Sequence, residues 1–376
     1  MDLDEAINLF HASLNALASD HHYICCISAN LGDALMDAFS RTHEPEHLEK
    51  AMAAYRVGVT CESAPVSERF DAARVWAHHA DSRHESALDA YCAAIELLPR
   101  LAMLGLDLQS RHQALISGSD GLARGAAACA VRSGRYEMAV ELLEAGHAVF
   151  WSQALQLRTP MTDLYEVAPE LVAKLKRISM ELERGSFRDV SRRLSEAPQK
   201  VMSMEKEASH FRRQNEEWLT TLEEVRQLDG FQNFLRPNRI SMLQHGATNG
   251  PVVILNASNT GCAALILTAT GIQHVPFPDL SFVAVTVLVK LLRYAVAQDG
   301  RNPSLPSAHV DGLVQQIPFV IDTSQLLRPP SDRHIGRASD VSEQPEEVFR
   351  YVLGVLWKSV VEPVIRRLDL EVQLFS

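Results

Sequence analysis

Hydrophobic positions in residues 3–151 recur with the 3.6-residue period of an α-helix, and no strand-like alternation of apolar and polar residues interrupts them. Turn-forming residues break this periodicity at 42–45, 63–65 and 116–121. The pattern therefore predicts a series of helices joined by short turns. Two of the apolar stripes are Leu3, Ile7, Phe10 and Leu14, and Leu48, Met52, Tyr55 and Val59.

A second pattern lies on top of this periodicity: a small residue followed four positions later by a large one. Because residues i and i+4 share a helix face, the small residue lets a neighbouring helix approach and the large one fills the space beside it. This is typical of the second helix of a tetratricopeptide repeat, although a generic array of helical hairpins also fits. Pro99 stands where such a repeat ends its helix. The copies begin 45, 36 and 52 residues apart and are Ala6/Phe10, Ala51/Tyr55, Ala87/Tyr91 and Ala139/Leu143.

The middle of the chain, residues 164–228, is also helical in pattern but richer in charge. Leu171, Leu175, Ile178 and Leu182 form one stripe, and Gly185 with Ser186 breaks the helix. A second helical run extends to Leu228. We expect a helical pair that packs on its neighbours, with a partner-binding coiled coil as the alternative.

The last third changes to strands and longer helices. Short β-branched runs bounded by turn residues predict strands at 252–256, 262–268 and 272–275, which together form an antiparallel meander. A helix is expected at 279–297, with Asp279 as its N-terminal cap. A long loop and a final amphipathic helix at 345–368 complete the prediction.

Composition narrows the function classes. The chain has 376 residues, of which 47% are hydrophobic and 22% charged, as in ordinary globular proteins of more than one domain. Its net charge of -11 argues against nucleic acid or an anionic membrane as a partner. No secretory leader and no apolar run of about 18 residues is present, so a cytoplasmic location is expected.

Candidate chemistry is sparse. The six cysteines form no CxxC pair and are expected to be reduced, mostly buried thiols. Cys262 and His274, on neighbouring predicted strands, are the one nucleophile and base pair worth naming, although a structural role fits them better. His245 with Gly246 precedes the first predicted strand, whereas a catalytic histidine is expected after an inner strand, so this pair is not a candidate. The adjacent pairs His21/His22 and His78/His79 have no metal-ligand spacing, and the sequence lacks phosphate-binding glycine loops.

Two sets of segments carry a combined pattern. The first set, in the repeat part, comprises residues 69–77, 96–106 and 139–160. The second set comprises residues 212–219, 228–231, 249–256, 261–266, 274–278, 355–357 and 360–364. Together they resemble fungal proteins in which tetratricopeptide-like repeats precede a CHAT domain, which has a caspase-like peptidase fold. The family usually carries Arg where this chain has His147, so a charge-based role is not expected there.

The resemblance implies a mainly α protein with tetratricopeptide-like repeats over 1–160, a long helical spacer over 161–235 and the front of a CHAT domain over 236–376. That front is an incomplete α/β segment with a three-strand meander. The family's catalytic His and Cys lie in the caspase-like sheet, which comes later in the domain, and neither has a counterpart in this sequence. We therefore expect a scaffold that binds a protein through its repeat surface, with no catalytic residue, cofactor or metal. The alternative is a fragment of a cysteine peptidase whose catalytic pair lies beyond residue 376.

Overall fold

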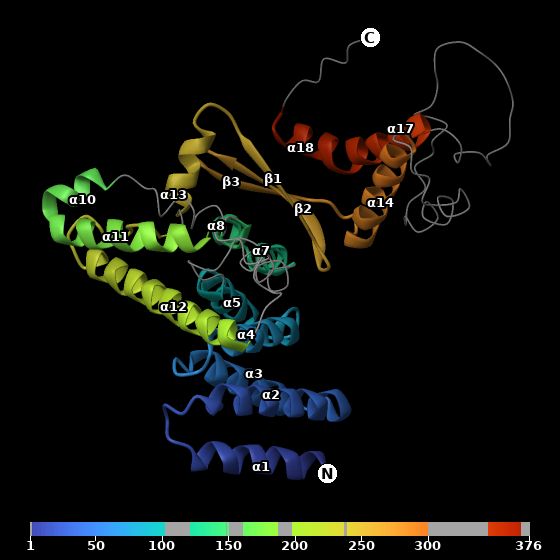
Figure 1. Ribbon diagram of the computed structural model, residues 1–376. Helices are drawn as coiled ribbons and strands as arrows, with labels where there is room; N and C mark the ends of the chain where they lie inside the picture. The colour runs from blue at the N-terminus through green and yellow to red at the C-terminus, as the bar shows by residue number, and fades with distance from the viewer. Residues whose placement is uncertain are drawn as a thin grey trace, which may run out of the picture. The chain divides into compact units, whose positions relative to one another are not determined.

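The chain is mainly helical and carries one small antiparallel sheet of three strands, which confirms the predicted fold class (Figure 1). The computed structural model describes residues 2–101, 121–147, 149, 161–186, 198–236, 239–299 and 345–369. These residues form two compact units. One comprises Met1–Ala130 and Glu141–Ile240, and the other comprises Val131–Val140 and Ser241–Ser376. The three-part domain division inferred from the sequence stays a prediction.

Successive helices of the first unit pack on one another in chain order, from α1 on α2 through to α4 on α5 (Figure 1). The turns predicted at 42–45 and 63–65 are confirmed, whereas residues 116–120 lie outside the described part of the chain. Helix α2 also contacts α4, so first helices of neighbouring hairpins touch. The helices up to residue 147 are α1 (Leu3–Ala16), α2 (Tyr23–Thr42), α3 (Pro45–Thr60), α4 (Val66–Ala80), α5 (Ala87–Leu101), α7 (Leu122–Arg132) and α8 (Tyr136–His147), and the end of α7 and the start of α8 belong to the second unit.

The turn between α2 and α3 shows how local chemistry shapes a hairpin. His43 ends α2 in the left-handed region, at a φ of 56°, and its amide donates to the carbonyl of Phe39 at 2.8 Å. Pro45 then starts α3, where its fixed φ suits a first helical position. The chain therefore reverses within two residues.

The small and large pairs of the sequence occupy the contacts between these helices. Ala51 and Tyr55 are fully buried, and the Tyr55 ring lies against Gly32 of α2. Tyr91 lies in the same way against Gly125 of α7. Close helix packing at these aromatic residues thus depends on glycines that the pattern did not identify.

Two of the four pairs show how position in the array changes burial. Ala139 and Leu143 of α8 are buried like the copies on α3 and α5. On α1, Ala6 and Phe10 are only half-buried, and no residue of that helix is fully buried.

Pro99 does not end its helix, contrary to the sequence prediction, because α5 continues to Leu101 with the proline inside it. Proline lacks an amide hydrogen, so only the hydrogen bond to the carbonyl of Ile95 is lost, and its φ is compatible with a helix. The helix therefore continues through Pro99.

The spacer folds as a helical pair, as predicted. Helix α11 (Pro169–Ser186) follows the short α10 (Thr162–Val167) and packs on α12 (Pro198–Arg226). The break predicted at Gly185 and Ser186 is not found, because both residues belong to α11, and residues 187–197 lie outside the described part of the chain. Surface ion pairs accompany this contact, including Arg177 to Glu217 at 2.6 Å. The buried residues shared by the two helices are Leu175, Ile178, Leu182, Trp218, Leu222 and Val225.

The second unit is organised around the sheet. Strands β1 (Val252–Ser258), β2 (Gly261–Thr268) and β3 (Gly271–Pro276) lie in the order β1-β2-β3, all antiparallel, close to the predicted spans. The sheet follows the short helices α13 (Ile240–Leu243) and η2 (Gln244–Ala247).

One face of the sheet, with Ala264, Ile266 and Val275, shares a core with α14 (Phe282–Asp299) and α17 (Pro345–Leu356). Leu265 and Leu267 are buried on the opposite face. Because side chains along β2 point alternately to the two faces of the sheet, this strand contributes buried apolar residues to both faces.

Two features of the helices in this unit differ from the predictions, the N-terminal cap of α14 and the regularity of the final helix. Ser281, and not Asp279, caps α14, because its hydroxyl accepts a hydrogen bond from the amide of Ala284 at 3.1 Å. The final helix contains a π-helical turn, η3 (Trp357–Val361), between α17 and α18 (Glu362–Arg367). Pro363 has no amide to donate at this point, which favours the wider turn.

Candidate functional site

The Cys262 and His274 pair cannot form a dyad in this fold. Leu265 pairs with His274 across β2 and β3, whereas Cys262 pairs with Ala257 on β1. Since side chains alternate along a strand, Cys262 and Leu265, three positions apart, point to opposite faces of the sheet. The thiol and the imidazole are therefore separated by the sheet itself.

Electrostatics agrees with that geometry. Burial raises the pKa of the Cys262 thiol, and a hydrogen bond to the Ser258 backbone opposes this only in part. Burial likewise lowers the pKa of His274. A nucleophilic cysteine needs a lowered pKa and a base within hydrogen-bond reach, and Cys262 has neither feature.

The remaining histidines of interest do not assemble a reactive site. His21 and His22 stack on each other, with ring centroids 4.7 Å apart. His245 is exposed on η2, which precedes the first strand. Among the residues that the structure describes, no three His, Cys, Asp or Glu side chains come together to hold a metal ion.

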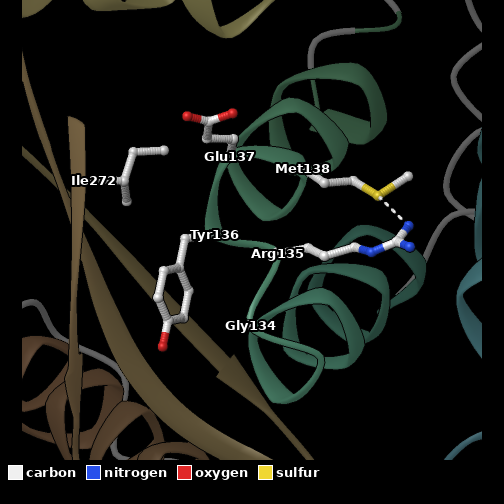
Figure 2. Close-up of a pocket in the computed structure, with 6 residues that line it drawn as sticks. All are labelled: Gly134, Arg135, Tyr136, Glu137, Met138 and Ile272. Carbon is white, nitrogen blue, oxygen red and sulfur yellow. Dashed lines mark hydrogen bonds between the residues drawn. The ribbon is translucent and has the colours of Figure 1, made fainter. Parts of the chain in front are cut away.

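A hollow of about 400 Å³ lies beside β3, at the turn that leads into α8 (Figure 2). Tyr136 stacks on His274 at 5.4 Å between ring centroids, and the Arg135 guanidinium lies 3.9 Å from the Met138 sulfur. Figure 2 shows Tyr136 and Ile272 on the strand side and Arg135 and Met138 turned toward each other. The hollow is open and contains no nucleophile beside a base, so it fits a packing boundary better than an active site.

The first helices of two hairpins, α2 and α4, each carry a row of exposed side chains. On α2 and on α4, exposed side chains recur at i, i+4, i+7 and i+11, which places each set on one helix face. We call these eight residues the α2–α4 face: Cys26, Asn30, Asp33 and Asp37, and Ser67, Asp71, Arg74 and His78.

Contacts beneath the α2–α4 face hold it in shape. The Tyr55 hydroxyl donates to the Asp33 carboxylate at 2.6 Å, and the Tyr55 ring stacks on His79 at 5.9 Å. Burial, followed by the neighbouring His78, lowers the pKa of His79, while Asp33 and Asp37 oppose that shift. His79 therefore lies within electrostatic reach of both carboxylates of α2 and links the two helices.

A second polar network connects α3 to the loop before α5 and to α4. His84 lies 3.0 Å from the Glu49 carboxylate and 2.7 Å from the Ser86 hydroxyl, and Ser86 accepts the indole N–H of Trp76 at 3.0 Å. The Arg56 guanidinium lies over the Trp76 ring at 5.4 Å. These contacts fix the spacing of neighbouring hairpins.

The α2–α4 face was not identified from the sequence, which pointed only to the repeat surface in general. The signal was present as polar residues at helical spacing on α2 and α4, but it resembles any solvated helix face. The structure adds that α2 contacts α4 and that Asp33 and Asp37 lie within electrostatic reach of His79, next to His78 of the second stripe.

No protein-family model matches the chain, and searches among curated proteins and among solved structures found no match either. Among the described helices, none combines the length and apolarity that crossing a bilayer requires.

Proposed function

We propose that this chain is a protein-binding scaffold built from tetratricopeptide-like hairpins, with the α2–α4 face as its binding surface. The observation that carries the proposal is the contact between the first helices of two hairpins, each of which carries an exposed polar stripe. Stacked helical hairpins create extended surfaces that suit polypeptide partners. The packing of Tyr55 on Gly32 and of Tyr91 on Gly125 supports the repeat assignment.

The partner is expected to present basic groups. Asp33, Asp37 and Asp71 place three carboxylates on the face, and Arg74 lies 3.9 Å from the last of them. Complementary charge steers association and sets specificity more than affinity.

The second unit is proposed to be a non-catalytic segment similar to the front of a CHAT domain, carried by the scaffold. Its three-strand meander and following helix support this, and the sheet keeps Cys262 apart from His274. The proposed location is the cytoplasm, with which six cysteines in no disulfide agree.

The test compares two double charge reversals in the full chain. Asp37→Lys with Asp71→Lys alters the α2–α4 face, and Glu62→Lys with Glu96→Lys makes the same change in net charge elsewhere on the surface. A partner identified by cross-linking in native extract is purified, and its affinity is measured by titration calorimetry.

We expect the first variant to bind at least about tenfold more weakly, equivalent to about 1.4 kcal/mol, and the control to bind like the wild type. Equal affinity of all three proteins for the partner would contradict the assignment of the surface. Circular dichroism of each variant checks that the helices are intact.

A further inference from the structure

The start of α2 and the end of α3 approach each other at backbone distance. A Cβ placed on Gly58 would lie 3.0 Å from the carbonyl oxygen of Cys25 and 3.6 Å from its Cα. The two helices therefore approach each other closely here, and the Ser28 Cβ, 3.5 Å from the same position, is the side-chain atom beside the contact. Cys25 is fully buried at this contact.

Cys61 follows Gly58 by three residues and lies at the same end of the hairpin. Its sulfur is 3.6 Å from the carbonyl oxygen of His21, one turn before Cys25, and 3.2 Å from the Ser63 hydroxyl. The Cα–Cβ bonds of a helix lean toward its N-terminus. The Cys25 side chain thus leans toward the level of His21, where the Cys61 sulfur lies.

The charge environment of Cys25 agrees with this placement. Burial raises the pKa of the Cys25 thiol to about 12, with Glu68 as the next cause, and Cys61 contributes more than Cys26, the adjacent residue. Cys61 is partly exposed, whereas Cys25 is not. The two thiols therefore differ in their access to a soluble oxidant.

We propose that Cys25 and Cys61 form a disulfide when the protein is exposed to a peroxide, so that the α2–α3 hairpin contains a redox-sensitive cross-link. The Cys61 thiolate attacks one peroxide oxygen and breaks the O–O bond, giving a sulfenic acid and hydroxide. The Cys25 sulfur then attacks the sulfenic sulfur, and water leaves as the S–S bond forms. Overall, two thiols are oxidised, and one hydrogen peroxide is reduced to two waters.

The bond joins the first turn of α2 to the C-terminal cap of α3. It would hold the hairpin closed at the end opposite its turn at His43. A cross-link of this kind limits the open conformations of the chain more than the closed one. The oxidised hairpin is therefore expected to open less often than the reduced one.

The test treats the reduced full chain with hydrogen peroxide, blocks the remaining thiols and digests with trypsin. Cys25 and Cys26 share tryptic peptide 1–41, and Cys61 lies in peptide 57–69. A linked species of these two peptides, cleaved by reductant, is the expected product. Cys26→Ser should retain it, whereas Cys61→Ser and Cys25→Ala should lose it.

Two further measurements keep the result decisive. The oxidised wild type should show slower amide exchange in α2 and α3 than the reduced protein, and Cys61→Ser should show no such difference after peroxide. Cys92→Ser serves as a matched control that keeps both the cross-link and the slowing. Links only between molecules, a link lost in Cys26→Ser, or thiols that stay reduced would each overturn the proposal.

Discussion

Replacement of Gly32 by alanine tests how closely the first hairpin is packed. The added Cβ would lie 2.5, 2.6 and 2.8 Å from the Tyr55 ring atoms Cε1, Cζ and Cδ1. The ring has little room to move, because it is fully buried and its hydroxyl is bonded to Asp33 at 2.6 Å. Overpacking of a core site costs about 1–3 kcal/mol.

Helix propensity acts in the opposite direction, since alanine in a helix interior is favoured over glycine by about 1 kcal/mol. The structure predicts that the steric term wins, with a net destabilisation of up to about 2 kcal/mol. Urea unfolding of the full chain measures this value, and amide exchange in α2 and α3 shows where the loss occurs.

A double-mutant cycle makes the prediction sharper. Tyr55→Val removes all three crowded ring atoms, so Gly32→Ala in that background should stabilise the protein by about 1 kcal/mol. The sign of the alanine effect should thus reverse between the two backgrounds. If Gly32→Ala stabilises the wild type by the same amount, the close contact between α2 and Tyr55 is refuted.

Three other predictions concern side chains in both units. Ser86→Ala leaves the buried indole N–H of Trp76 without its acceptor and should lower the free energy of unfolding by about 1–3 kcal/mol in a urea titration. Burial lowers the pKa of His79 in the folded protein, so below pH 6.5 this histidine binds a proton more readily in the unfolded state. The free energy of unfolding should therefore fall as the pH drops from 6.5 toward the lowered pKa of the folded state. His79→Gln should flatten that slope between pH 7 and pH 5, and an unchanged slope would count against this role. Cys262, only 6% exposed and with a raised pKa, should react with iodoacetamide far more slowly than exposed Cys26, as followed by peptide mass spectrometry.

The sequence by itself determined the class and most elements of the fold. Helical periodicity located the hairpins and the α11–α12 pair, and β-branched runs between turns located the three strands to within two residues. Local signals sufficed because the period of apolar residues reflects which side of an element is buried. The same signals misplaced the cap of α14 and placed a helix end at Pro99, where α5 continues.

Only the tertiary structure decided what covers each buried side. Periodicity did not show that the Tyr55 ring lies against Gly32, or that α2 and α4 contact each other. Strand pairing determined that Cys262 and His274 point to opposite faces, and the approach of α3 to α2 brought the Cys61 sulfur to the carbonyl of His21. These contacts join residues far apart in the chain, and their distances depend on packing between whole elements, which no local pattern encodes.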